Sequence, residues 1–325
     1  MSGLARYARQ LGLDVAGYDK TDTALTHELK KEGISIGFEE NSDHFNRWFD
    51  RNERERTGIV RTPAVPTNHP LFDRVTELAL PVLKRSEMLG AIAQSFETFA
   101  VAGTHGKTTT TAMLSHLLAE SPGGCNAFLG GILASTGSNV LLNPKSRRLV
   151  VEADEFDRSF LQLNPTHAVI TSMDPDHLEV YGDADGFRAG FAAFGKQVSG
   201  TLIRESALAS SEAELTYGCA SDRQIANQLD YAASQPRIES GWMVADIKMR
   251  DEWFDSVKFP MPGMHNLSNA LAALSLADLA GANREDCMQS IGHFKGIQRR
   301  FAYHIRESHG TYTVSYTHLR AHETS

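Results

Sequence analysis

A glycine-rich turn that leads into a helix is the part of the sequence best suited to bind phosphate. The apolar run 99–102 is typical of a buried strand, and the chain then turns at Gly103 and Gly106. Glycine lets the backbone approach an anion closely, and the first amides of a helix point at it. Lys107 can reach the outer phosphates of a nucleotide, and the Thr108 hydroxyl can hold magnesium. The predicted phosphate loop comprises Gly103, Thr104, His105, Gly106, Lys107, Thr108 and Thr109.

This loop departs from the strict phosphate-loop pattern at one position. The strict pattern has a glycine five residues before Gly106, where this chain has Val101. The alternative is an ordinary turn between a core strand and a core helix. We favour phosphate binding, because Lys107 followed by threonines at a helix start is otherwise unexplained.

A cluster of carboxylates follows the next strongly apolar run. Residues 148–152 are typical of a central strand, and the segment 152–157 supplies four acidic side chains. In an α/β sheet, ligands bind at the carboxyl ends of the strands. We therefore expect a magnesium or substrate role for Glu152, Asp154 or Glu155, although a solvated turn is the alternative. Magnesium usually takes only one or two carboxylates.

A second acidic segment follows the predicted strand 167–171. Asp174, Asp176, His177 and Glu179 lie close together there, without a cysteine or a second histidine that would suggest zinc. A second magnesium site or a substrate contact is the expected role. A loop that caps the following helix is the alternative.

Two further sets of polar residues lie in the last quarter of the chain. His265, Asn266 and Asn269 lie at the start of the predicted helix 265–280, where they can cap the helix or hydrogen-bond a base such as adenine. Spacing does not decide between these two roles. The Arg299–Arg300 pair suggests a phosphate contact, because the guanidinium is always charged and forked.

The elements that must position these residues alternate between strand and helix. The start of the chain predicts a helix over 1–10 and a strand over 15–19. A nucleotide-binding domain usually opens with a strand and a glycine turn, so we expect native sequence upstream of Met1; a domain that starts with a helix is the alternative. Helices are also predicted over 71–80 and 81–89.

Composition limits the class of protein. The chain has 325 residues, enough for two or three domains, and a formal charge of −8 that argues against a general nucleic-acid surface. Cys125, Cys219 and Cys287 are far apart, which favours reduced thiols and a cytoplasmic protein. No apolar stretch approaches membrane length, so we expect no membrane partner.

The order of the motifs carries a resemblance to a known family. The chain resembles the Mur ligases of bacterial peptidoglycan synthesis, and 1–7 and 81–89 are also similar to that family's first domain. The motifs that carry the resemblance occupy 103–111, 152–157, 174–177, 262–270 and 296–301.

The resemblance implies an α/β fold. The expected domains are a truncated UDP-substrate-binding, Rossmann-like domain over 1–90 and a central ATP-binding domain of phosphate-loop type with a mostly parallel sheet over 91–302. Residues 303–325 would be the start of a third domain followed by a non-native tail over 314–325. We therefore expect a fragment that binds ATP and does not turn over by itself.

The resemblance also implies a reaction. ATP would phosphorylate the carboxylate of UDP-N-acetylmuramate, and the amine of L-alanine would attack the acyl phosphate. A sister ligase that attaches a recycled tripeptide to the same sugar nucleotide is one alternative. A nucleotide-binding module without turnover is the other.

Residue roles carry over from the family motifs. Lys107, His177 and Arg300 would act in catalysis, with Arg300 at the outer phosphate. Thr108, Glu152 and His177 would be magnesium ligands. Asn266, with His265 or Asn269, would contact the adenine of ATP.

Overall fold

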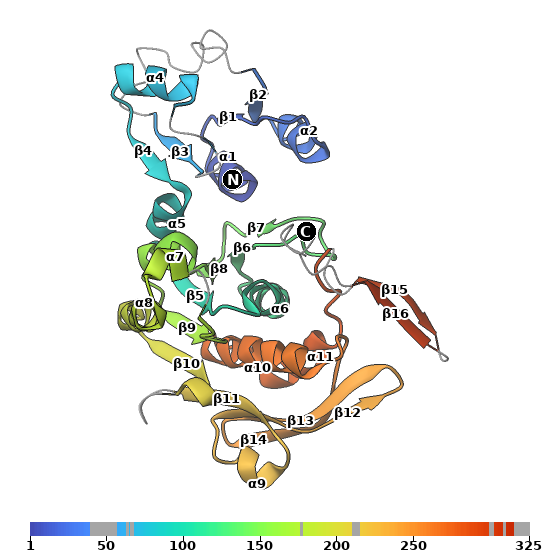
Figure 1. The fold of residues 1–325 in the computed structure, drawn as a ribbon. Helices are drawn as coiled ribbons and strands as arrows, with labels where there is room; N and C mark the ends of the chain where they lie inside the picture. The colour runs from blue at the N-terminus through green and yellow to red at the C-terminus, as the bar shows by residue number, and fades with distance from the viewer. Residues whose placement is uncertain are drawn as a thin grey trace, which may run out of the picture. The chain divides into compact units, whose positions relative to one another are not determined.

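Two compact units make up the chain, unit 1 (Met1–Ile92) and unit 2 (Ala93–Ser325). The computed structural model (Figure 1) describes residues 1–39, 57–62, 65, 68–175, 178–209, 215–298, 302–307 and 310–314.

The first half of unit 1 is a strand pair with two helices. Helix α1 spans Ser2–Gln10, β1 spans Ala16–Tyr18, α2 spans Ala24–Lys31 and β2 spans Ser35–Gly37. Strands β1 and β2 run parallel. Thr23 is the N-cap of α2, and its side chain accepts a hydrogen bond from the Thr26 amide while the Thr26 side chain accepts one from the Thr23 amide. This reciprocal cap satisfies two amides at the helix start.

The second half of unit 1 corrects one prediction. Strand β3 (Ile59–Arg61), helix α4 (Pro70–Glu77), strand β4 (Val82–Lys84) and helix α5 (Arg85–Ala93) follow in order. The helix predicted over 81–89 is wrong for its first part, because β4 pairs in parallel with β3. The Lys84 amide donates to the Glu87 carboxylate at 2.7 Å, which helps to end the strand and start the helix.

Unit 2 is built on one large sheet. Among the described residues, a 10-stranded sheet has the order β14-β13-β12-β11-β10-β9-β5-β8-β6-β7. Its strands are β5 (Glu97–Ala102), β6 (Asn126–Phe128), β7 (Val140–Leu141), β8 (Arg148–Ala153), β9 (His167–Ile170), β10 (Thr201–Glu205), β11 (Leu215–Ala220), β12 (Tyr231–Glu239), β13 (Trp242–Met249) and β14 (Glu252–Phe259).

Parallel strands form the centre of this sheet, as the sequence predicts. From β6 through β8, β5, β9, β10 and β11 to β12 each neighbouring pair is parallel. Antiparallel strands lie at both edges: β7 on β6, and β13 and β14 on β12. The buried residues of β5 and β8 are nearly all apolar, which is typical of parallel strands covered on both faces.

Helices cover both faces of the sheet (Figure 1). One face carries α6 (Lys107–Glu120), α10 (Met264–Leu279) and α11 (Arg284–Ile291), and the other carries α7 (Leu178–Tyr181) and α8 (Ala184–Gln197). The 3-10 helix η2 (Phe156–Gln162) packs against α8. The remaining elements are η3 (Ser206–Leu208), α9 (Arg223–Ala226) and the antiparallel pair β15 (Ala302–Glu307) and β16 (Gly310–Val314).

Each face has its own apolar packing. Helices α6 and α10 pack against alternate residues of the strands, such as Phe99 and Val101 of β5. On the other face, Phe160 of η2 stacks on Phe194 at 5.1 Å and meets Phe191 edge-on at 5.3 Å. The sheet is therefore the middle layer of a three-layer α/β unit.

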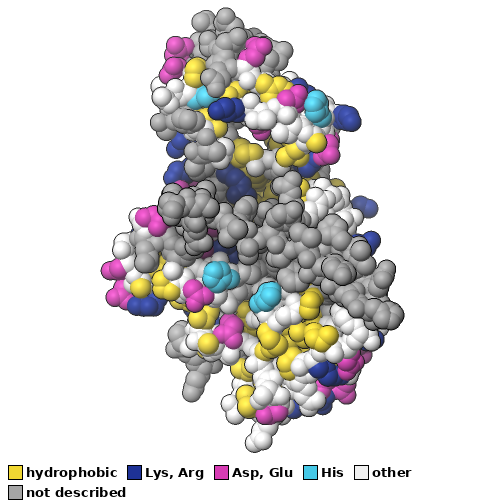
Figure 2. Space-filling model, turned by 45° about the vertical axis from the view of Figure 1, so that its right-hand side comes forward, with side chains coloured by type: hydrophobic (Ala, Val, Ile, Leu, Met, Phe, Trp, Pro, Cys, Tyr) yellow, Lys and Arg dark blue, Asp and Glu magenta, His cyan; other side chains and the backbone are white. Residues whose placement is uncertain are grey.

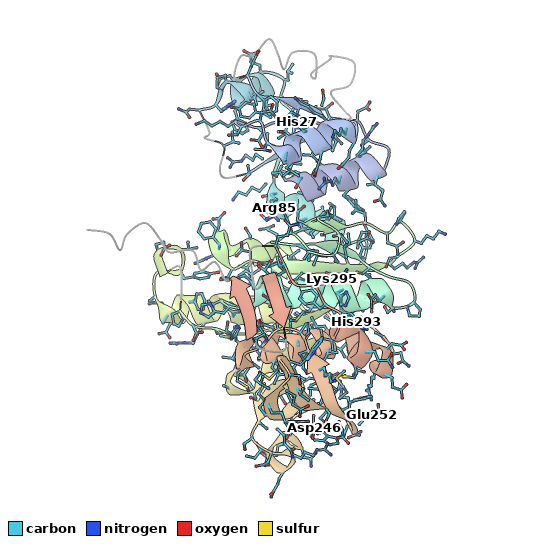
Figure 3. The ribbon with its side chains drawn as sticks, turned by 90° about the vertical axis from the view of Figure 1, so that its right-hand side faces the viewer. His27, Arg85, Asp246, Glu252, His293 and Lys295 are labelled. Atoms are coloured by element: carbon cyan, nitrogen blue, oxygen red, sulfur yellow. The ribbon has the colours of Figure 1, made fainter. Side chains whose placement is uncertain are left out.

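A charged network ties the antiparallel edge to the helices. Arg284 donates to Asp278 at 2.7 Å and to Glu252 at 3.2 Å, and the Tyr231 hydroxyl donates to Asp278 at 2.8 Å. Figure 3 labels Glu252 at the start of β14. The hydrogen bond to Asp278 raises the pKa of Arg284 above its usual range. These contacts join strands β12 and β14 to helices α10 and α11.

None of the helices in the described ranges is long and apolar enough to cross a membrane. On the face shown in Figure 2, lysine and arginine side chains lie interspersed with aspartate and glutamate.

Helix α10 offers a test of the core. Leu271 is fully buried, so Leu271→Ala should lower the free energy of unfolding by about 2–5 kcal/mol through lost burial and a residual cavity. Met264, which is 47% exposed on the same helix, is the matched control, and Met264→Ala should cost less than about 1 kcal/mol. Urea titrations of both variants measure the difference; equal losses would contradict this packing.

Candidate functional site

The register of three parallel strands brings three loops of the predicted site to one edge of the sheet. Strand β5 pairs with β8 so that Ala102 lies opposite Ala153, and with β9 so that Ala102 also lies opposite Ile170. The three strands therefore end at the same edge of the sheet. The phosphate loop follows β5, the acidic loop that starts at Asp154 follows β8, and residues 171–175 follow β9.

Two glycines of the phosphate loop have conformations that favour glycine. Gly103 has φ 133° and Gly106 has φ 81°, both in the positive range. A Cβ atom at Gly103 would collide with the Thr171 hydroxyl, and one at Gly106 would collide with the Asn269 side chain. Gly106 is the N-cap of α6, so the loop leads directly into the 14-residue helix. The amides at that helix start can bind an anion.

The segment after β9 holds the phosphate loop in shape. The His105 amide donates to the Ser172 hydroxyl at 2.8 Å, and the Thr171 hydroxyl donates to the His105 carbonyl at 2.5 Å. The hydroxyls of Thr104 and Ser172 lie 2.9 Å apart. The sequence reasoning did not single out Thr171 and Ser172, although two hydroxyl residues directly after a strand next to β5 are a usable signal.

Lys107 forms an ion pair across the site. Its ammonium donates to the two carboxylate oxygens of Glu155 at 2.6 and 2.9 Å, and to the Gly103 carbonyl at 2.8 Å. The side chains of Lys107 and Glu155 are 12% and 3% exposed. The lysine is thus held at the loop rather than extended into solvent.

Glu152 lies beside Thr108. The Thr108 hydroxyl donates to Glu152 Oε1 at 3.1 Å, and the Gly130 amide donates to Oε2 at 3.1 Å. Burial raises the pKa of Glu152, although the nearby Lys107 charge and these hydrogen bonds act in the opposite direction. The carboxylate charge is therefore incompletely compensated, and a cation beside Thr108 would compensate it.

The acidic loop is held in a strained conformation. Asp157 and Arg158 have φ values of 53° and 54°, which is unusual for residues other than glycine. The buried Tyr181 hydroxyl donates to the Glu155 carbonyl at 2.7 Å, and burial raises the pKa of Tyr181 to about 12. Asp154 is exposed, and its carboxylate accepts from the Phe156 amide. The surrounding contacts thus fix the loop backbone at Glu155.

The residues predicted to contact adenine lie in different environments. Asn266 is buried and donates to the Pro262 carbonyl at 2.7 Å, so one amide hydrogen stabilises the turn before α10. Asn269 is buried against Gly106 of the phosphate loop. His265 is exposed. The start of α10 is therefore next to the phosphate loop.

Two predicted residues lie outside the described part of the chain. These are His177 and Arg300, and their neighbours Asp176 and Arg299 also fall outside it. Within the described ranges, no three His, Cys, Asp or Glu side chains form a candidate metal centre. A magnesium assignment from the described residues rests on Thr108 and Glu152.

Two domain models of one family match the chain. Residues 101–277 match the Mur ligase middle domain, and residues 1–97 match the Mur ligase family, catalytic domain.

Several proteins similar to this chain have the same enzyme name. The chain is 42% identical over 321 residues to UDP-N-acetylmuramate–L-alanine ligase of Flavobacterium psychrophilum, covering 98% of this chain and 69% of that protein. It is 40% identical to the ligase of the same name from Porphyromonas gingivalis, covering 93% and 66%. The UDP-N-acetylmuramate-alanine ligase structure from Thermotoga maritima matches with a TM-score of 0.81 and 27% identity, over 98% of this chain and 72% of that one.

A tripeptide ligase shares the fold. The UDP-N-acetylmuramate:L-alanyl-gamma-D-glutamyl-meso-diaminopimelate ligase structure from Neisseria meningitides matches with a TM-score of 0.76 and 21% identity, over 92% of this chain and 96% of that one.

The raised pKa of Glu152 predicts a pH-dependent stability. A carboxyl group whose pKa is higher in the folded state destabilises the fold when ionised, and this cost disappears below its unfolded-state pKa. Glu152→Gln should therefore raise the melting temperature at about pH 7.5 and change it little at about pH 4. The Thr108 hydroxyl can rotate to accept from the new amide. Thermal unfolding without nucleotide measures the effect, and equal shifts at both pH values would contradict it.

Proposed function

The chain belongs to the Mur ligase family, and on that basis we propose that it joins L-alanine to the carboxylate of UDP-N-acetylmuramate at the expense of ATP. This reaction makes a precursor of peptidoglycan. The curated relatives named for this reaction, 40–42% identical over most of the chain, support the choice of substrates. The observation that carries the chemistry is the convergence of Lys107, Thr108 and Glu152 at the end of the parallel sheet. We place the reaction in the cytoplasm.

The reaction needs an activated carboxylate. A free carboxylate is a poor electrophile, so its oxygen first attacks the terminal phosphorus of ATP and ADP leaves. The resulting acyl phosphate is attacked by the amine of L-alanine. The tetrahedral intermediate loses inorganic phosphate, and the amine loses a proton as the amide forms.

The described residues supply charge and position for the first step. Amides of the phosphate loop at the start of α6 bind the outer phosphates of ATP. Lys107 adds a positive charge next to the phosphoryl group that is transferred. We assign Arg300 to the outer phosphate and His177 to the region of the substrate carboxylate.

Thr108 and Glu152 fit a magnesium ion. Hard oxygen donors are the ligands that magnesium prefers, and Glu152 has a carboxylate charge that its surroundings leave incompletely compensated. We propose that Thr108 and Glu152 hold one ion with the phosphates, and that His177 belongs to a second site. Bound there, magnesium would neutralise charge that develops on the transferring phosphoryl group.

The start of α10 is the proposed adenine site. Asn269 is next to the phosphate loop, and Asn266 keeps its carbonyl oxygen after its amide has bonded Pro262. His265 is exposed and can approach a base. We propose that residues 91–302 bind ATP through these groups and that residues 1–90 bind the UDP part of the substrate.

Lys107 provides the first test. Lys107→Ala should weaken ATP binding about tenfold or more in the presence of magnesium, because a charge-assisted contact to phosphate is worth roughly 1.5–3 kcal/mol. Isothermal titration calorimetry measures the affinity, and circular dichroism controls for folding. Unchanged affinity would remove Lys107 from the phosphate site.

Substrate dependence provides the second test. We would join residues 1–302 to the part of the Flavobacterium psychrophilum ligase that lies beyond its match with this chain, and measure phosphate release from ATP. Release should require both UDP-N-acetylmuramate and L-alanine, and Glu152→Gln should abolish it. Release that requires the tripeptide in place of L-alanine would identify the sister reaction instead, and ATP binding without release under either condition would indicate a binding module.

A further inference from the structure

The ammonium of Lys107 has acceptors for all of its hydrogens before a nucleotide is bound. It can donate three hydrogen bonds, and the Gly103 carbonyl and the two Glu155 oxygens lie within 2.9 Å of Nζ. Both side chains are nearly buried, so water competes little for these contacts. A phosphate oxygen can therefore bond to this ammonium only if it shares or replaces one of these acceptors.

The backbone at Glu155 is held in place by hydrogen bonds to its own carbonyl and to the carbonyl of Asp154. Its carbonyl accepts from the Tyr181 hydroxyl at 2.7 Å and from the Arg158 amide at 3.0 Å. The Phe160 amide donates at 2.9 Å to the carbonyl of Asp154, the residue before Glu155. These hydrogen bonds surround Asp157 and Arg158 and hold them in left-handed backbone conformations. The carboxylate is thus preset next to Lys107 by the fold of the acidic loop.

Its position distinguishes Glu155 from Glu152. Glu152 is bonded to Thr108 and Gly130, whereas the carboxylate of Glu155 is bonded to Lys107. A carboxylate that already has a cation as its partner has less need of a metal ion. The two acids at this strand end therefore have different partners and can have different roles.

We propose that Glu155 is a positioning residue that holds Lys107 at the phosphate loop in the ATP-free protein and releases it to the outer phosphates when ATP binds. This inference rests on the proposed function, which supplies ATP as the ligand. The Glu155 carboxylate and the phosphate oxygens are alternative anionic acceptors for one ammonium. Because ATP must replace the Glu155 contacts of Lys107, its affinity is lower than the loop would give with a free lysine. Without ATP, these same contacts keep the ammonium at the loop.

The experiment is a double-mutant cycle on ATP affinity in the 325-residue chain, measured by calorimetry with magnesium present. Glu155→Gln keeps the size of the side chain and removes its charge, so it should tighten ATP binding about three- to tenfold. In the Lys107→Ala background the same change should have a much smaller effect, because the ammonium that is exchanged is gone.

A matched control lies on the same helix as Lys107. Glu120 is at the C-terminal end of α6, is exposed, and accepts from the Ser290 hydroxyl. Glu120→Gln makes the same chemical change away from the loop and should leave ATP affinity unchanged. Thermal unfolding reports whether each variant is folded. If Glu155→Gln does not fold, Glu155→Asp retracts the carboxylate by one methylene and should give a smaller gain in affinity.

The remaining outcomes separate this proposal from the proposed function. Weaker ATP binding in Glu155→Gln would overturn the exchange and place Glu155 among the cation ligands. An equal gain with and without Lys107 would also overturn it, because Glu155 would then act on the phosphates by charge alone. If the parent chain binds ATP and Glu155→Gln binds it equally well, only the exchange fails. If the parent chain does not bind ATP, the proposed function fails and the exchange fails with it.

Discussion

The site depends on the parallel register of β5 with β8 and β9. Parallel neighbours end at the same edge of a sheet, so Ala102, Ala153 and Ile170 bring three loops to one place. An antiparallel neighbour would send its following loop to the opposite edge. The core strands bury nearly all of their side chains, and polar groups appear where the strands end. The chemistry of the site is thus confined to the boundary between the apolar core and the loops.

Charge at this boundary is only partly compensated. Lys107 and Glu155 neutralise one another in a nearly buried setting, which avoids the high cost of an isolated buried charge. Glu152 has hydrogen bonds from Thr108 and Gly130, but burial raises its pKa, so its ionised form is less stable there than it would be in water. The site therefore combines one satisfied ion pair with one carboxylate that a cation would stabilise. The two acids lie three positions apart in sequence and differ because the chain turns between them.

Much of the fold, and the strand ends that form the candidate site, could be predicted from sequence. Apolar runs marked β5, β8 and β9, and the glycine turn before Lys107 marked the start of α6, because burial and turn chemistry act locally. The strand β4 was missed, since Val82 and Leu83 continue a helical pattern and become a strand only through pairing with β3. The contacts of Glu155 with Lys107 and of Ser172 with His105 could not be read from spacing. They depend on which strands are neighbours, and this order is a property of the whole sheet.

The position of β5 in the sheet also bears on how the protein folds during synthesis. The ladder that begins at Glu97 opposite Arg148, and the one that begins at Phe99 opposite His167, both involve residues made much later. Strand β5 is therefore synthesised before β8 and β9, and until they are made both of its edges are unpaired. Non-local parallel pairing is slow, and an exposed apolar strand is prone to aggregate in the meantime. The same placement that gives the phosphate loop two supporting neighbours makes the nascent chain a candidate client for chaperones.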